Sequence, residues 1–540
     1  MERAAAGIEG PSGTTPTAAG PQARQPGMRL DALHLSRSAG EASLLRDVTL
    51  TVEAGEFVGL LGPSGSGKST LLKALMGIAP ADAGRVVFDG KDLPLAYEEL
   101  SRRIGYVPQD DIIHLTLTVG EVLRYAAALR LPAEMPEMEV HLRIHRALKS
   151  VDMEGREDSL VRTLSGGQRK RVSVAVELLT DPAILFLDEP TSGLDPANEA
   201  RSMALFRSLA DGGRTVVITT HIVENIDLFD RVALLSKGRL VFFGPPSALF
   251  GAFEVTRVLD VYERLKERSP GEWEGEFRAG DLYRAEVVER ERQVPRTPLP
   301  SPRVGAGRFQ LPTLVARYFQ TLLRDRINLA ILLVQAPLIA AVLVLAYNAG
   351  TKVGDQNLIF KMSIVAVWFG CINSCREIVK EKPIYERERM VGLGILSYAL
   401  SKVLVLAVLC AVQTVLLLGG VLLFERLPGN PLQYALVLFL TAASSLTLGL
   451  LLSALVDSSD KALSMLPIAL IPQLIFVSVQ GELTGAARQI EKVMISKWGY
   501  VGVQHVLERK GIVNELGMLG VFAVVLFAVT VAALHARDRK

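Results

Sequence analysis

A glycine-rich stretch followed by lysine and two hydroxyl residues is the part of this sequence that most directly indicates chemistry. It lies between a β-like run at 56–61 and a helical run at 71–76. Glycines here let successive backbone N–H groups point inward and hold phosphate oxygens at a helix N-terminus. A lysine adds charge for the β- and γ-phosphates, and the next hydroxyl suits Mg²⁺. We therefore expect nucleoside triphosphate binding by Gly62, Pro63, Ser64, Gly65, Ser66, Gly67, Lys68, Ser69 and Thr70.

Further polar elements follow the phosphate loop in a fixed order. An apolar run at 184–187 delivers Asp188 and Glu189 at its end, where carboxylates can hold a cation or activate water. Another β-like run closes at His221. The remaining elements are Gln109 in Gly105-Tyr106-Val107-Pro108-Gln109-Asp110, the run Leu164-Ser165-Gly166-Gly167-Gln168, and Ser192-Gly193-Leu194-Asp195.

Together these elements resemble the ATP-binding cassette (ABC) family of ATPases over roughly residues 29–244. The resemblance implies that Glu189 polarises the water that attacks ATP and that His221 senses the γ-phosphate. Gln109 would contact Mg²⁺ or that water and relay nucleotide occupancy to the membrane. The metal residues would be Ser69, Gln109 and Asp188. The resemblance further implies that Ser165 and Gly167 close on the γ-phosphate held by a partner subunit, so the site would be complete only in a dimer. Gly166, Gln168 and Asp195 would also bind nucleotide.

One departure from the family concerns the nucleobase. The family usually places an aromatic side chain upstream of the phosphate loop to stack on adenine, whereas the stretch 34–39 contains none. Arg37 could replace it by a cation–π contact.

Composition bounds the class of protein. At 540 residues the chain is too long for one core. The net charge is +2 and no block of basic residues stands out, so the charge pattern does not indicate nucleic-acid binding. Cys371, Cys375 and Cys410 have no disulfide or zinc spacing. The first residues lack an apolar core, so we expect no cleavable signal peptide. A mean hydropathy of +0.30 is high for a wholly soluble protein.

The chain divides by composition into four parts. Residues 1–27 are expected to form a disordered tail. Alternating β-branched and helical runs predict an α/β nucleotide-binding domain at 28–245. A charge-rich stretch ending in a Pro-rich linker forms a connector at 246–310. The rest, 311–540, is expected to be an all-α membrane domain with six transmembrane helices.

The membrane domain is predicted to begin with an amphipathic helix at 311–326, lying at the membrane interface; an ordinary surface helix is the alternative. Lys361 and Lys402 lie near span ends, where their ammonium groups could reach the membrane surface. Six apolar segments then approach the roughly 20 residues that a helix needs to cross a bilayer. They lie at about 328–347, 357–375, 397–424, 432–455, 462–480 and 515–535.

Basic residues predict the orientation in the cell (plasma or inner) membrane. The loop at 376–389 and the tail at 537–540 are rich in Arg and Lys and lie on one side, which the positive-inside rule assigns to the cytoplasm. Both termini would then be cytoplasmic. The opposite loop at 481–514 also carries basic residues, which argues mildly against this orientation. The need of the nucleotide domain for cytoplasmic ATP decides the choice.

The order of nucleotide domain before membrane domain narrows the resemblance. The runs 368–377 and 385–389 look like the G (White) subfamily of ABC exporters, especially its bacterial relatives. This implies a half-transporter, with a homodimer as the simplest assembly and a heterodimer with a related chain left open. It also implies that spans two and five line a central cavity and that a helix at about 378–390 touches the nucleotide domain.

The resemblance places Asn373, Ser374, Gln473 and Ser478 at the substrate cavity, although interhelical hydrogen bonding explains them equally well. Small residues at 442–445 are expected to allow close helix packing. Few charges in the spans favour a lipid-like or amphipathic cargo, exported by alternating access driven by ATP. The alternative is an ABC ATPase that does signalling or mechanical work on envelope partners. An importer is a third reading.

Overall fold

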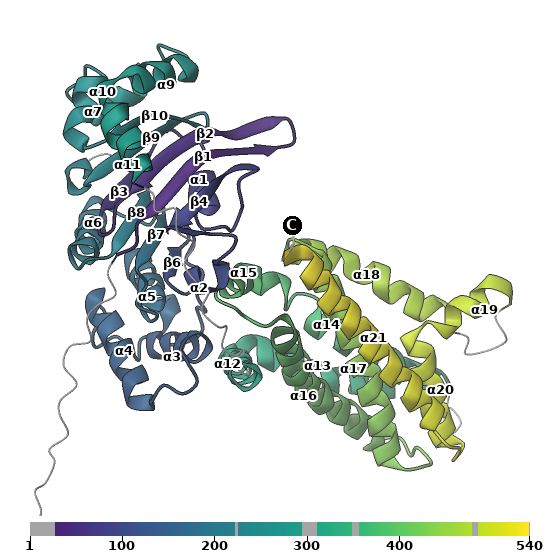
Figure 1. The fold of residues 1–540 in the computed structure, drawn as a ribbon. Coiled ribbons are helices and arrows are strands. Elements are labelled where there is room, and N and C mark those ends of the chain that lie inside the picture. The colour runs from purple at the N-terminus through teal and green to yellow at the C-terminus, as the bar shows by residue number, and fades with distance from the viewer. Residues whose placement is uncertain (1–26, 222–224, 294–309, 348–355, 478–483, 539–540) are drawn as a thin grey trace, which may run out of the picture.

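A computed structural model describes residues 27–221, 225–293, 310–347, 356–477 and 484–538. An α/β domain comes first and a bundle of long helices follows, as predicted (Figure 1). Most of the predicted tail at 1–27 and the Pro-rich part of the connector lie outside the described residues, and so does Ser478.

The central sheet of the first domain carries the phosphate loop. Its strand order is β10-β9-β3-β8-β7-β6, and all neighbours are parallel except β10 and β9. Continuous apolar runs form its middle strands because helices cover both faces, which is typical of parallel sheets. The strands are β3 (Phe57–Leu61), β6 (Ile104–Val107), β7 (Ile184–Asp188), β8 (Thr215–Thr219), β9 (Arg231–Ser236) and β10 (Arg239–Gly244).

A second, antiparallel sheet lies beside it, with the order β2-β1-β4-β5. A hairpin turn after Ala39 joins its two longest strands. The strands are β1 (Leu30–Ala39), β2 (Ala42–Val52), β4 (Ala83–Phe88) and β5 (Lys91–Asp92).

Two helices of the first domain, those that follow Thr118 and Ser165, begin at clear sequence signals. Thr118 and Ser165 each cap a helix while the third helical residue, Glu121 or Gln168, bonds back to the cap. Such capping boxes satisfy backbone N–H groups that have no partner within the helix. The helices are α1 (Lys68–Leu75), α2 (Tyr97–Leu100), α3 (Val119–Arg130), α4 (Glu137–Ser150), α5 (Gly166–Leu178) and α6 (Pro196–Asp211).

The described part of the connector packs against the nucleotide domain. Leu249, Phe253 and Trp273 are buried in the same apolar core as the central sheet, and the rings of Phe253 and Trp273 lie 4.9 Å apart. Its elements are α7 (Pro246–Ala252), α8 (Val258–Arg264), α9 (Pro270–Ala279), α10 (Asp281–Tyr283), a π-helical turn (Arg284–Val288) and α11 (Glu289–Arg292).

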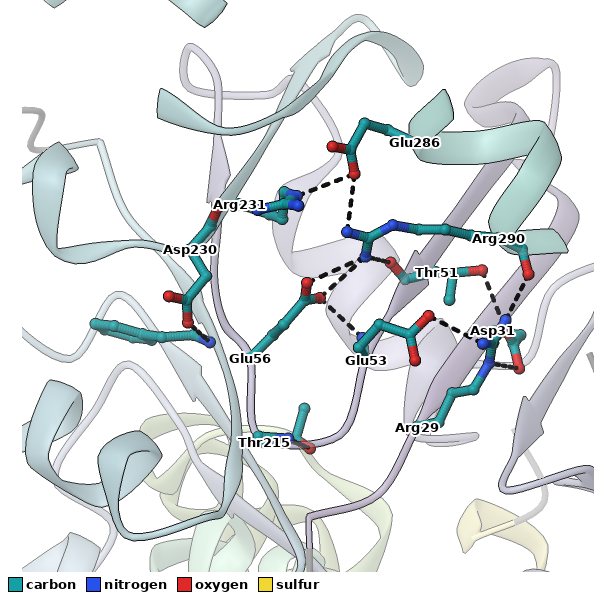
Figure 2. A network of polar contacts seen from close by, with 12 residues as sticks. Arg29, Asp31, Thr51, Glu53, Glu56, Thr215, Asp230, Arg231, Glu286 and Arg290 are labelled. Atoms are coloured by element: carbon teal, nitrogen blue, oxygen red, sulfur yellow. Dashed lines mark hydrogen bonds and ion pairs between the residues drawn. The ribbon is translucent and has the colours of Figure 1, made fainter. Parts of the chain in front are cut away.

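Ion pairs fasten the end of the connector to both sheets, as Figure 2 shows. Arg290 donates to Glu56 at 3.1 Å and pairs with Glu286 at 2.9 Å. Glu286 also accepts from Arg231 of β9 at 2.9 Å. Arg29, which directly precedes β1, donates to the carbonyl oxygen of Arg290 at 2.6 Å. We call this set the connector clasp.

Five helices of the second domain are long and apolar enough to cross a membrane, among the residues that the structure describes. The fifth predicted span is shorter: α18 covers 17 residues and contains Pro467 and Pro472. That α18 crosses the membrane as a sixth span therefore remains a prediction. The helices are α13 (Arg326–Tyr347), α14 (Gln356–Ser374), α16 (Ile395–Leu422), α17 (Pro431–Leu455), α18 (Ser459–Ile475) and α21 (Val513–Asp538).

Tight packing of α14 on α17 occurs at Gly370, where a Cβ atom would lie 2.1 Å from the carbonyl oxygen of Ala442.

Shorter helices lie at the two ends of the bundle. Helices α12 (Leu311–Arg324) and α15 (Lys382–Met390) lie between the two domains (Figure 1). The segment 481–514, predicted as a loop, contains α19 (Gly485–Lys492) and α20 (Ile495–Leu507). Ser496, Tyr500 and Val503 of α20 are buried against the bundle, so this connection between the last two predicted spans includes a packed helix.

Candidate nucleotide site and its link to the membrane helices

The phosphate loop connects β3 to α1, and its glycines determine its shape. Gly62, Gly65 and Gly67 have φ angles of 145°, 75° and 103°, a backbone region that other residues rarely adopt. A Cβ atom at Gly67 would lie 2.9 Å from the carbonyl oxygen of Leu44 on β2. The loop and the β1–β2 hairpin therefore approach each other because residue 67 has no side chain.

Lys68 is held inside the loop. Its buried ammonium donates to the carbonyl oxygens of Gly62 at 2.7 Å and Pro63 at 3.1 Å. Burial lowers the pKa of Lys68, whereas the nearby carboxylates of Glu189 and Asp188 raise it. These carbonyls position the charge where the loop would hold phosphate oxygens.

Asp188 lies at the end of β7, directly beside the loop. Its Oδ1 accepts from the hydroxyl of Ser69 at 3.0 Å and from that of Thr219 at 2.7 Å. The carboxylate and the Ser69 hydroxyl thus form a cluster of hard oxygen atoms, the kind of ligand that Mg²⁺ prefers.

Glu189 has a backbone φ of 41°, which is uncommon for a residue with a side chain. Its N–H donates to the Thr219 hydroxyl at 2.9 Å, which holds this turn. The side-chain Oε2 accepts from Gln109 Nε2 at 3.2 Å and lies 3.5 Å from His221 Nδ1. Two side chains that are far apart in the sequence, Gln109 and His221, therefore converge on the Glu189 carboxylate.

The cleft around this cluster extends beyond the residues predicted from the sequence. The predicted residues 64–70, Gln109 and Glu189 line it on one side. The rest of the lining is formed by Glu41, Ala42, Ser43, Leu44 and Arg46 of the β1–β2 hairpin and by Lys237. Arg37 points elsewhere, because its guanidinium donates to the carbonyl oxygen of Pro80 at 2.8 Å.

The Ser165–Gln168 run forms the first turn of α5. Ser165 accepts from the backbone of Gln168 at 3.3 Å and so caps this helix. Asp195 caps α6 in the same way, accepting from the backbone N–H of Asn198 at 3.0 Å. Neither run is among the described residues that line the cleft of the same chain. Their nucleotide-binding role stays a prediction that needs a second subunit.

Arg387 of α15 joins the membrane domain to the helix that begins at Ser165. Its guanidinium donates to Glu177 Oε1 at 2.5 and 2.9 Å and to the carbonyl oxygens of Ile112 at 2.8 Å and Ser173 at 3.2 Å. Glu177 and Ser173 belong to α5, and Ile112 follows Gln109 by three residues. One side chain thus contacts both segments that the sequence linked to nucleotide binding.

Glu177 was not found from the sequence. Burial alone would raise its pKa, but Arg130 and Arg387 lower the pKa of this carboxyl to about 2. Arg130 of α3 donates to it at 2.9 and 3.1 Å. An acidic residue within an apolar helical run was the available signal, but its two partners are remote in sequence.

The polar face of α12 contacts α3 of the nucleotide domain. Gln320 donates to Glu121 at 2.6 Å, and Arg324 donates to the same carboxylate at 2.5 Å. Arg317 is buried and pairs with Glu388 of α15. The helix is therefore amphipathic, as predicted, and its polar side serves this contact between domains.

Lys402 does not reach the membrane surface, so that prediction was wrong. Its side chain is 2% exposed and pairs with Glu381, and its ammonium lies 3.6 Å from the centre of the Tyr318 ring. A buried counter-charge and an aromatic face remove the need for solvent.

Three of the four predicted cavity residues, Asn373, Ser374 and Gln473, are among the described residues, and these three are buried. Asn373 Nδ2 donates to Gln413 of α16 at 2.6 Å, and Ser374 bonds to Gly370 of its own helix at 2.7 Å. Gln473 accepts from the backbone N–H of Ser496 on α20 at 3.0 Å. Asn373 and Gln473 thus make the interhelical bonds that the sequence left open, while cavity lining in an assembled dimer stays a prediction.

A phosphate loop, a carboxylate pair at the end of a buried strand and a buried contact to apolar helices define a nucleotide-hydrolysing domain coupled to a membrane domain. The family described as "ABC transporter" matches residues 45–192, and that described as "ABC-2 type transporter" matches residues 309–507. The chain belongs to the ABC transporter family, with a multi-pass membrane domain after its ATPase domain.

Relatives cover the chain to different extents. The ABC transporter ATP-binding/permease protein Rv1747 of Mycobacterium tuberculosis is 33% identical over 493 residues, which are 85% of this chain and 55% of that protein. The broad substrate specificity ATP-binding cassette transporter ABCG2 of Bos taurus is 38% identical over 228 residues, 41% of this chain and 34% of that protein. The Nod factor export ATP-binding protein I of Burkholderia lata is 35% identical over 238 residues, 43% of this chain and 76% of that protein. The chain therefore spans about half the length of the mycobacterial relative.

Proposed function

We propose that this chain is an ATP-driven exporter of a lipid-like or amphipathic molecule, working as a homodimer by alternating access. The observation that carries the proposal is the contact of Arg387 with Glu177, which ties the membrane helices to the helix that Ser165 begins. One relative, the Nod factor export ATP-binding protein I, is named for export, which supports export as the direction.

The nucleotide site supports hydrolysis of ATP. Lys68 would contact the β- and γ-phosphates, and Ser69, Asp188 and Gln109 would hold Mg²⁺. Bound Mg²⁺ would neutralise charge on the phosphate oxygens. Glu189 would accept a proton from the attacking water, and its neighbour His221 would contact the γ-phosphate.

The role of a second subunit rests on Ser165 and Gly167. Their helix N-terminus offers backbone N–H groups to an anion, and α5 has 13 residues, enough for an aligned dipole. Because the run is absent from the cleft of its own chain, we propose that it closes on the nucleotide of a partner. We propose a homodimer, since Lys68, Glu189 and Ser165 are all present in the one chain.

Coupling would follow from movement of α5 when the dimer closes. Arg387 would transmit that movement to α15, and Arg317 would pass it to α12 through Glu388. Because buried ion pairs lose much stability when separated, these helices would move as one body. We propose that rearrangement of the bundle then exposes the cavity residues Asn373, Ser374, Gln473 and Ser478 to cargo.

The proposed orientation places both termini and the nucleotide domain in the cytoplasm. In Figure 1, α15 lies at the nucleotide-domain end of the bundle, whereas α19 and α20 lie at the far end. The far end would therefore face outward from the cell membrane, where cargo would leave.

Reconstitution in proteoliposomes tests the proposal. Inside-out vesicles with wild-type protein should show ATP hydrolysis and uptake of at least one member of a panel of fluorescent lipids and amphiphiles. Glu189→Gln should bind ATP but lose both activities. Hydrolysis without flux of any amphiphile, together with a tightly bound envelope protein, would favour signalling or mechanical work.

A further inference from the structure

The nucleobase end of the cleft can be located from the catalytic end. Glu189, Gln109 and His221 converge at one side of the phosphate loop, where the γ-phosphate must lie for hydrolysis. The base of a bound nucleotide must therefore extend to the other side. Apart from the phosphate loop, Gln109 and Glu189, the described lining of the cleft is formed by the β1–β2 hairpin and Lys237, and it contains no aromatic residue.

Residues of β2 present one side chain face to this space. Leu44 and Arg46 alternate with Leu45, which is 1% exposed and belongs to the core. Since successive side chains of a strand point to opposite faces, Leu44 and Arg46 share the face that lines the cleft. This face combines an apolar surface with a guanidinium group.

The backbone holds this face in place. The N–H of Arg46 donates to the carbonyl oxygen of Gly238 at 2.8 Å. The carbonyl oxygen of Leu44 lies where a Cβ atom at Gly238 would come within 2.4 Å, so only a glycine allows the approach. The hairpin is thus anchored to the turn that carries Lys237 and to the phosphate loop.

The side chain of Arg46 is available for a ligand. It is exposed, and within the described chain its guanidinium makes no hydrogen bond or ion pair. By contrast, Arg37, the candidate from the sequence, is engaged with Pro80. A guanidinium plane can stack on a nucleobase by a cation–π contact, and the adjacent Leu44 can contact the ring edge.

We propose that Arg46, supported by Leu44, is the platform on which the nucleobase stacks in this protein. Stacking reads the ring face rather than the base edge, so ATP and GTP should bind with similar affinity. The inference rests on the proposed function only in placing a nucleoside triphosphate at the phosphate loop.

Competition binding separates a base contact from a phosphate contact. The full-length protein carrying Glu189→Gln, in detergent, is equilibrated with radiolabelled ATP and titrated with unlabelled ATP, GTP or tripolyphosphate. Arg46→Ala should raise the Kd of ATP and GTP about two- to fivefold and leave that of tripolyphosphate unchanged. Arg46→Tyr should restore or tighten ATP binding.

Two control variants sharpen the outcome. Arg37→Ala should bind all three competitors as the parent does, and Lys237→Ala should not reproduce the base-dependent loss. Equal weakening of tripolyphosphate by Arg46→Ala, or no weakening of ATP, would overturn the inference. A parent protein that fails to bind ATP would overturn both proposals, whereas base-dependent binding without cargo flux would overturn only the exporter.

Discussion

Arg387 and Glu177 lie 2.5 Å apart across the boundary between the two domains and are both buried. They are separated by 210 residues in the sequence. Arg130 contacts the same carboxylate from the nucleotide domain, so Glu177 would keep one partner if Arg387 moved away. This arrangement lets the membrane domain be attached to α5 without making the fold of the nucleotide domain depend on the attachment.

Removal of Arg387 should therefore uncouple transport from hydrolysis. Arg387→Ala is expected to reduce cargo flux at least about tenfold while ATP hydrolysis stays within about threefold of wild type, because a truncated buried charge pair loses several kcal/mol. Both rates are measured in the same proteoliposomes. Arg389→Ala is the matched control, since Arg389 on the same helix pairs with Asp538. Equal loss of both rates in Arg387→Ala would contradict the uncoupling.

The stabilising effect of Glu177 should depend on pH. Its folded-state pKa is about 2, below the usual value of 4.5, so its contribution is complete above pH 4.5 and is lost as the pH falls toward 2. The difference in free energy of unfolding between wild type and Glu177→Gln should thus be larger at pH 7 than at pH 4. Denaturant unfolding in detergent measures it, with exposed Glu263→Gln as control. A difference that grows on acidification would refute this prediction.

Lys402 and Glu381 should behave as one unit in stability. Lys402→Met alone leaves a buried carboxylate without its partner, so it should lower the free energy of unfolding by about 3–5 kcal/mol. The double variant Lys402→Met with Glu381→Gln should cost less than the single variant, because no uncompensated charge remains. Thermal unfolding of purified protein gives the order of the midpoints. A double variant less stable than either single variant would count against this pairing.

The connector clasp should stabilise the nucleotide domain. Arg290→Ala removes the ion pairs with Glu56 and Glu286. It also removes the cation–π contact with the Phe243 ring, whose centre lies 5.9 Å from the guanidinium. We expect the free energy of unfolding to fall by about 1–3 kcal/mol, which is typical for the loss of hydrogen bonds to charged groups. The control is Arg284→Ala, whose side chain is 72% exposed and pairs with exposed Asp281. Equal thermal midpoints for the two variants would show that the clasp adds nothing.

Much of the geometry of the candidate nucleotide site was predictable, because its residues form short runs in the sequence. The phosphate loop at 62–70 and the carboxylate pair at the end of β7 are short runs whose spacing already determines their geometry. Long apolar helices were equally visible, since their length is set by the bilayer.

Contacts between distant segments were not predictable from one sequence. Nothing in the neighbourhood of Glu177 indicates that Arg387 would reach it, and Lys402 was expected at the membrane surface because Glu381 was not known to face it. Arg46 was missed for a related reason: its role depends on β2 lying beside the phosphate loop, which requires the approach of Leu44 to Gly67.

The central claim, that two copies share each ATP, is tested most directly by mixing two defective variants. Lys68→Met and Ser165→Arg, carried on separately tagged copies, should each be inactive in ATP hydrolysis as homodimers. A mixed dimer purified through both tags contains one site with an intact Lys68 and a partner's intact Ser165. It should recover up to about half of the wild-type rate, since symmetry gives two sites and one is whole. Mixed dimers as inactive as their parents, or Ser165→Arg homodimers that hydrolyse ATP at the wild-type rate, would contradict the shared site.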